Sequence, residues 1–172
     1  MNGVRAIVAA FRAQKLLSIG EFDKARAILE DMYLRYGSEA LPPPSSRVYA
    51  HINLIYALSL QWCGEKAAAI RAYAFVLDQI RNDMRWPGRP CNQDELKYIR
   101  CYIRNSLLAL SSNPDDPAFA LAVSVASDSS RFDPRGVTGR MKRMFPLDDE
   151  QVEHNGSIAA QWERLRNPPT AQ

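Results

Sequence analysis

The chain has 172 residues, enough for one domain that folds without help from a metal or disulfide bonds. Hydrophobic residues make up 47% and charged residues 24%, which is typical of a folded globular protein and does not fit a disordered chain. The formal net charge of +3 is too small to indicate a nucleic-acid partner by itself, because phosphate binding needs clustered positive charge.

Neither the cysteines nor the N-terminal segment indicates export. The three cysteines, Cys63, Cys91 and Cys101, are odd in number and have no C-x-x-C spacing, so neither a disulfide framework nor a zinc site is indicated. Arg and Lys interrupt the apolar residues near the N-terminus, and no run of about 18 apolar residues is present to cross a bilayer. We therefore expect a soluble cytoplasmic protein that binds no metal or cofactor and makes no contact with a membrane.

Apolar residues recur every three or four positions along six segments, which predicts six α-helices. Glycine accepts the left-handed backbone that closes a helix, so Gly20 and Gly64 are expected to end the first and third helices. Asn92 or Asp94 can cap the fifth helix, and Pro117 suits the first position of the sixth. The expected helices span residues 4–18, 22–36, 47–62, about 65–82, 93 or 95 to about 110, and 117 to about 127.

Segments rich in proline, glycine and short polar residues separate these helices and predict a stiff connector, a loop and a turn. These breaks fall at residues 38–46, 85–93 and 111–117. The pattern predicts an all-α protein whose residues 1–130 form three antiparallel helix hairpins. Residues 131–172 are expected to form an irregular C-terminal extension with a basic segment and a short capping helix at 157–166.

The stretch "GEFDKARAILEDMYLRY" resembles part of a tetratricopeptide repeat (TPR), in which two antiparallel helices turn at a small residue and an aromatic residue follows. Gly20 lies at the turn, Phe22 follows it, and Ala25 occurs where the two helices would cross closely. Leu29 and Met32 would then face the preceding helix. One such hairpin cannot bury its apolar face alone, so copies of it stack.

The resemblance weakens along the chain. The second hairpin repeats the pattern at Gly64, Ala69, Tyr73 and Val76, with Lys66 in place of the aromatic residue. In the third hairpin only Ala120 is in register, and the two good turns are farther apart than the roughly 34 residues of a regular array. The resemblance implies a short TPR-like α-solenoid over residues 4–128, and a plain irregular helical bundle is the alternative.

The resemblance implies a non-catalytic interaction module, because TPR-like repeats bind a peptide or protein partner in the groove between the first helices of successive hairpins. Adaptor, chaperone and immunity roles all remain open. The family's clamp for a C-terminal carboxylate does not carry over to its matching positions Ala10, Gln14, Ile55, Tyr102 and Ser106. The candidate partner-binding residues on the expected first helices are Gln14, His51, Leu58, Gln61, Trp62, Tyr102 and Asn105.

The expected fifth helix adds two basic candidates. Lys97, Arg100 and Arg104 fall on one stripe of that helix, beside Tyr102 and Asn105. Arg100 and Arg104 are therefore expected to pair carboxylates of a partner, although a merely solvated helix face explains the same pattern.

A second basic cluster supports the alternative function, a regulator that binds nucleic acid. Arginine and lysine neutralise phosphates, and flanking Phe132 and Phe145 could stack on bases. Acidic residues follow at 148–153, so internal pairing is the competing explanation. The basic residues of this cluster are Arg131, Arg135, Arg140, Lys142 and Arg143.

No catalytic residue is predicted. The chain has two histidines, and neither His51 nor His154 is accompanied by a recognisable nucleophile motif. His51 lies on an otherwise apolar helix, where a hydrogen-bonded core or groove histidine is the expected role. We therefore expect that the protein is not an enzyme.

Overall fold

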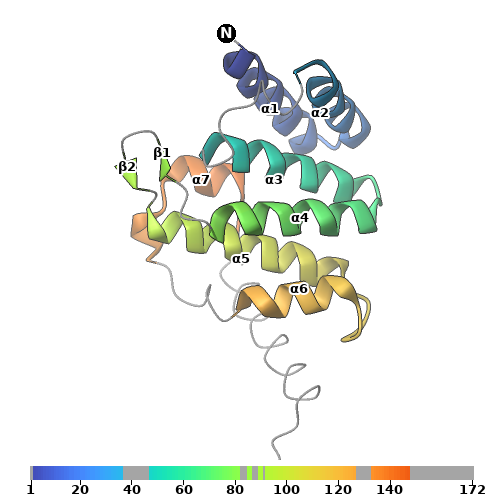
Figure 1. The fold of residues 1–172 in the computed structure, drawn as a ribbon, viewed down its shortest axis with the longest axis vertical. Helices are drawn as coiled ribbons and strands as arrows, with labels where there is room; N and C mark the ends of the chain where they lie inside the picture. The colour runs from blue at the N-terminus through green and yellow to red at the C-terminus, as the bar shows by residue number, and fades with distance from the viewer. Residues whose placement is uncertain are drawn as a thin grey trace, which may run out of the picture. The chain divides into compact units, whose positions relative to one another are not determined.

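The structure, a computed structural model, consists of α-helices with one pair of two-residue strands between the fourth and fifth helices (Figure 1). It describes residues 2–36, 47–81, 85–86, 89–90, 92–126 and 133–147. The chain divides into two compact units, residues 1–91 and 92–172. The helical class is confirmed in the described residues, whereas the TPR-like solenoid and the repeat boundary at residue 130 stay predictions.

The first unit contains four helices whose ends agree with the predicted ones to within two residues. They are α1 (Asn2–Ser18), α2 (Phe22–Tyr36), α3 (Arg47–Trp62) and α4 (Lys66–Arg81). Two-residue strands then pair antiparallel, β1 (Arg85–Trp86) with β2 (Arg89–Pro90), where the sequence predicted a loop. A ladder of two residues per strand is too short to show the alternating pattern of a strand, so the sequence signal was that of a loop. The predicted connector 38–46 lies outside the described residues.

The turns that join α1 to α2 and α3 to α4 are built alike. Gly20 has φ of 81° and Gly64 has φ of 79°, the left-handed backbone predicted for both positions. The N–H of Glu21 donates to the carbonyl of Leu16 at 2.9 Å, and the N–H of Glu65 donates to that of Leu60 at 2.9 Å. In both hairpins the first helix therefore ends in the same C-terminal cap, which requires glycine at the left-handed position.

Helix α3 lies at the centre of the first unit, in contact with α1, α2 and α4. Its nearly continuous apolar sequence is typical of a helix that packs against several neighbours. The residues of α3 that are buried are Ile52, Asn53, Leu54, Ile55, Ala57, Leu58, Ser59 and Leu60.

Small residues allow the helices of each hairpin to pack closely. Ala25 on α2 and Ala69 on α4 are completely buried, as the predicted register requires. We expect Ala25→Leu and Ala69→Leu each to lower the free energy of unfolding by about 1–3 kcal/mol, because three extra carbon atoms would overpack a filled interface. Chemical denaturation followed by circular dichroism measures the change.

The same helices provide matched controls for these substitutions. Ala27 on α2 and Ala67 on α4 are exposed, so Ala27→Leu and Ala67→Leu should change the free energy of unfolding by no more than about 0.5 kcal/mol. Equal stabilities of the buried and exposed variants would show that the interface has room for a larger side chain.

The second unit begins with a pair of packed helices, α5 (Gln93–Leu110) and α6 (Pro117–Ala126). The side chain of Asn92, one of the two caps that the sequence offered, caps α5 by accepting a hydrogen bond from the N–H of Asp94 at 3.0 Å. In the turn between the helices, Asp116 accepts hydrogen bonds from the backbone of Ser112 at 3.1 Å and Ala118 at 3.0 Å. The polar residues of the turn therefore bond the local backbone, which confirms the reason given for predicting it.

Residues 133–147 are more ordered than the sequence indicated. They contain a short 3₁₀ turn, η2 (Pro134–Gly136), and a six-residue helix, α7 (Gly139–Met144), where irregular backbone was predicted. Thr138 caps α7 and its hydroxyl donates to Glu95 on α5 at 2.9 Å. The segment is thus held against α5. The predicted helix at 157–166 lies outside the described residues.

Candidate functional site

The predicted partner-binding residues of the first unit differ in how accessible they are. Leu58 is buried, whereas Gln14, His51 and Gln61 are partly exposed. The Oε1 atom of Gln61 accepts a hydrogen bond from the hydroxyl of Tyr73 at 2.5 Å, which links α3 to α4. Leu58 and Gln61 therefore contribute to packing within the unit.

Trp62 is 57% exposed, but one face of its ring is covered. It stacks on Phe22 with ring centroids 5.5 Å apart and an interplanar angle of 14°. This contact joins the end of α3 to the start of α2, and it leaves the other face of the indole accessible. Trp62 consequently has a structural role beside any role in binding.

The predicted residues of the second unit differ in how accessible they are. Tyr102 packs on Phe145 with ring centroids 5.4 Å apart, and burial together with nearby Tyr98 raises the pKa of Tyr102 to about 12. Arg104 is buried and donates to the sulfur of Cys101 at 3.2 Å, so it does not belong to an exposed basic stripe. The sequence interpretation placed Arg104 on an exposed stripe because residue spacing alone does not show which arginine is buried. Arg100 and Asn105 are partly exposed.

These predicted residues fall in both units of the chain. Gln14, His51, Leu58, Gln61 and Trp62 belong to the first unit, and the others belong to the second. A groove that uses all of them therefore stays a prediction.

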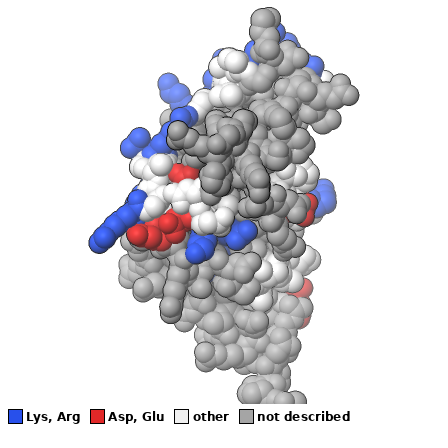
Figure 2. Space-filling view, turned by 60° about the vertical axis from the view of Figure 1, so that its left-hand side comes forward, with Lys and Arg blue, Asp and Glu red and all other residues white. Residues whose placement is uncertain are grey.

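The basic cluster predicted for nucleic acid is exposed where the structure describes it. Arg135, Arg140, Lys142 and Arg143 are all exposed, while Arg131 lies outside the described residues. On the face shown in Figure 2, basic side chains lie beside acidic ones among the described residues. Nucleic-acid binding by this cluster stays a prediction.

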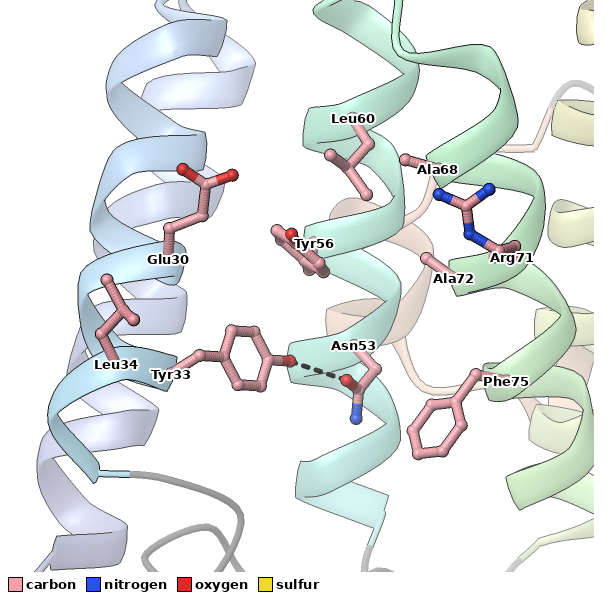
Figure 3. A pocket seen from close by; sticks show the side chains of 10 residues that line it. All are labelled: Glu30, Tyr33, Leu34, Asn53, Tyr56, Leu60, Ala68, Arg71, Ala72 and Phe75. Atoms are coloured by element: carbon pink, nitrogen blue, oxygen red, sulfur yellow. Dashed lines mark hydrogen bonds between the residues drawn. The ribbon is translucent and has the colours of Figure 1, made fainter.

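A groove of about 640 Å³ lies in the first unit between α2 and α4, with α3 as its floor. We call it the α2–α4 groove (Figure 3). The residues that line it are Glu30, Tyr33, Leu34, Asn53, Tyr56, Leu60, Ala68, Arg71, Ala72 and Phe75.

Helical spacing places the lining residues on three facing stripes. The floor is formed by Asn53, Tyr56 and Leu60, which are three and four residues apart on α3. On α4 the small side chains of Ala68 and Ala72 are one turn apart and occupy little space between the helices. Larger side chains at these two positions would reduce the volume of the groove.

A polar contact fixes the aromatic side of the groove. The hydroxyl of Tyr33 on α2 donates to Oδ1 of buried Asn53 at 2.7 Å, and Figure 3 shows this bond between the two helices. The ring of Tyr33 also meets that of Tyr56 at a centroid distance of 5.3 Å and an angle of 59°. The bond satisfies the buried amide oxygen of Asn53 and links α2 to α3 beside the groove. Burial, followed by the charge of Glu30, raises the pKa of Tyr56.

Apolar side chains on both walls are accessible. Leu34 on α2 is 87% exposed and Phe75 on α4 is 43% exposed. In Figure 3, Phe75 projects from α4 toward the part of α3 that carries Asn53. Two large apolar side chains beside an aromatic floor form a surface that an apolar side chain of a partner can cover.

Charged groups of both signs lie at the edges of the groove. The carboxylate of Glu30 on α2 accepts a hydrogen bond from Nε of Arg26 at 2.7 Å, and Nη1 of Arg26 donates to Glu65 at 2.7 Å. On α4 the side chain of Arg71 is exposed. The α2–α4 groove thus has an apolar centre with polar edges, the pattern found in many protein interfaces.

The sequence interpretation did not select any residue of this groove. It took its candidates from α1, α3 and α5, the first helices of the hairpins, whereas the groove uses both second helices. The available signal was the position of Leu34 and Phe75 outside the buried stripes of their own helices.

The described titratable residues favour no particular reaction. Burial is the main cause that raises the pKa of both Cys63 and Cys101, and for Cys63 the carboxylate of Asp23 adds to the effect. Both side chains are therefore held as thiols, the less nucleophilic form. Within the described ranges no group of three or more His, Cys, Asp and Glu side chains is placed to hold a metal ion, and no helix there is long and apolar enough to cross a membrane.

Comparison of the chain with protein-family models, with curated proteins and with solved structures gives no match. The similarity to tetratricopeptide repeats therefore rests on the residues of the two hairpins alone.

Proposed function

We propose that the protein is a non-catalytic interaction module that binds a segment of another protein in the α2–α4 groove. The observation that carries this proposal is the exposure of Leu34 and Phe75 on opposite walls of a groove that has Tyr56 in its floor. Burying accessible apolar surface is the main favourable term in protein association. The role is compatible with an adaptor, a chaperone or an immunity protein.

The shape of the groove favours a partner segment that inserts apolar side chains between two helices. Ala68 and Ala72 leave room on the α4 wall, and the hydrogen bond between Tyr33 and Asn53 holds the opposite wall in place. A pre-formed site loses little conformational entropy when a partner binds. Glu30 and Arg71 at the edges can pair with charges of both signs, which would fix the orientation of the segment.

Substitutions in the groove test the proposal. Leu34→Ala and Phe75→Ala should each weaken binding of the natural partner by about 2 kcal/mol, or about thirtyfold, because each removes an apolar contact at the site. Ala72→Trp should block binding by filling the space beside α4. Partners are recovered from native cells with the full chain, identified by mass spectrometry, and their affinities are measured by calorimetry.

Ile19 provides the control, because it is 65% exposed but does not line the groove. Ile19→Ala should bind the partner as the unchanged chain does, and circular dichroism should show equal helicity in all variants. A partner that binds Ala72→Trp with unchanged affinity would place the binding surface elsewhere.

A further inference from the structure

The outward face of α1 carries a stripe of exposed apolar residues. Val4, Val8 and Phe11 are 66%, 51% and 43% exposed, although the opposite face of the helix is buried in the first unit. The outer face of a terminal hairpin in a stack of helices is normally polar, since it faces water. Here three large apolar side chains share one line along the helix, which marks a surface for association.

The spacing of these residues suits a partner that is itself a helix. Val8 follows Val4 by four residues and Phe11 follows Val8 by three, which is the alternation along the seam of a coiled coil. Arg5 and Arg12 are seven residues apart and therefore flank the stripe on the same side. A second helix packed along α1 would contact the apolar stripe and both guanidinium groups.

The charge of α1 determines what kind of helix fits. Arg5, Arg12 and Lys15 are exposed, and the helix sequence NGVRAIVAAFRAQKLLS contains no Asp or Glu. The charged side chains that α1 places beside the apolar stripe are therefore all cations. Acidic side chains on a partner helix would complement it, because opposite charges beside an apolar seam select the partner.

A second copy of this chain fits the surface poorly. Lys15 is four residues beyond Phe11 and so continues the line of the apolar stripe. In a parallel pair of α1 helices, Lys15 of one copy would lie opposite Lys15 of the other. In an antiparallel pair, Arg5 of one copy would approach Arg12 of the other. Both arrangements bring like charges together. A bilayer also fits poorly, because an interfacial helix inserts a wide apolar face, and here Ala6, Ala10 and Ala13 on the other face are already buried.

We propose that the outer face of α1 binds an acidic amphipathic helix of another protein, with Val4, Val8 and Phe11 covering its apolar stripe and Arg5 and Arg12 pairing with its carboxylates. This surface shares no residue with the α2–α4 groove, so the two proposals can fail separately.

The test uses the full chain and a synthetic helix of about three heptads, with Leu at positions a and d and Glu at e and g. The repelling glutamates keep this peptide from pairing with itself. A second peptide carries Lys in place of Glu. Fluorescence anisotropy should show that the acidic peptide binds at least about tenfold more tightly than the basic one.

Substitutions in α1 test whether the peptide binds through the proposed residues. Val8→Glu should weaken binding of the acidic peptide by about tenfold or more, whereas Ile19→Glu, at an exposed residue beyond the end of α1, should leave it within about twofold. The double variant Arg5→Glu, Arg12→Glu should reverse the preference so that the basic peptide binds more tightly. Circular dichroism checks that each variant remains helical.

Several outcomes would overturn the proposal. They are equal binding of the two peptides, no binding of either, or acidic-peptide binding that Val8→Glu leaves unchanged. Dimerisation in sedimentation experiments that Val8→Glu abolishes would instead assign the surface to a second copy. Binding to vesicles that contain phosphatidylserine, lost in Val8→Glu, would assign it to a membrane surface.

Discussion

Replacing Phe145 by alanine should lower the free energy of unfolding by about 3–5 kcal/mol, the cost of removing a fully buried ring and leaving a cavity. Phe145 packs on Tyr102, and its carbonyl accepts a hydrogen bond from the hydroxyl of Tyr98 at 2.6 Å. Both tyrosines belong to α5. The loss would show that residues 133–147 form part of the folded second unit.

Two comparison variants show whether the loss of stability comes from the cavity left by the buried ring of Phe145 or from the loss of any large apolar side chain. Phe145→Leu should cost less than Phe145→Ala because it leaves a smaller cavity, and Phe75→Ala should cost little stability because Phe75 is 43% exposed. Hydrogen exchange locates the change: amides of α5 should lose protection while those of α3 keep it, since the two helices lie in different units. Unchanged protection of α5 would mean that the segment does not stabilise this helix.

The bounds of the first six helices could be predicted because each has a strong local signal. Gly20 and Gly64 close helices through a backbone that other residues rarely adopt, and both have the positive φ that the prediction required. Asn92 caps α5, and Pro117 begins α6 as expected. Residues near the end of a helix determine where it stops, so the helix bounds can be read from the sequence alone.

The order of residues 133–147 could not be predicted in the same way. Val137, Met141 and Phe145 are four residues apart and all buried, but charged residues and Gly139 separate them in a segment too short to show a period. The hydrogen bonds that tie this segment to α5 join Phe145 to Tyr98 and Thr138 to Glu95, partners 47 and 43 residues apart in the chain. Contacts at that distance are not visible in a local pattern.

The α2–α4 groove illustrates a further limit of sequence interpretation. Ala68, Ala69 and Ala72 are the same residue type on one helix, yet Ala69 is completely buried at a helix contact while the other two line open space. A small residue either lets two helices approach or leaves room between them. Only the packing of α2, α3 and α4 decides which applies.

Raising the pH above about 10 should destabilise the protein through Tyr102. Burial is the main reason that the pKa of Tyr102 rises to about 12, whereas in the unfolded chain this phenol ionises near pH 10. The folded state therefore favours the neutral phenol. Its contribution is fully present below pH 10 and is lost between about pH 10 and 12, a total of at most about 3 kcal/mol.

Tyr102→Phe isolates this contribution from the other groups that ionise in the same range. Phenylalanine keeps the ring against Phe145 but has no hydroxyl, so the stability of the variant should decrease less steeply above pH 10. Urea denaturation of both proteins from pH 8 to about 12 gives the two curves, and the difference between them belongs to Tyr102 because the remaining tyrosines and lysines are common to both. Parallel curves would show that this phenol ionises as readily in the folded chain as in the unfolded one, and that Tyr102 is open to water rather than enclosed beside Phe145.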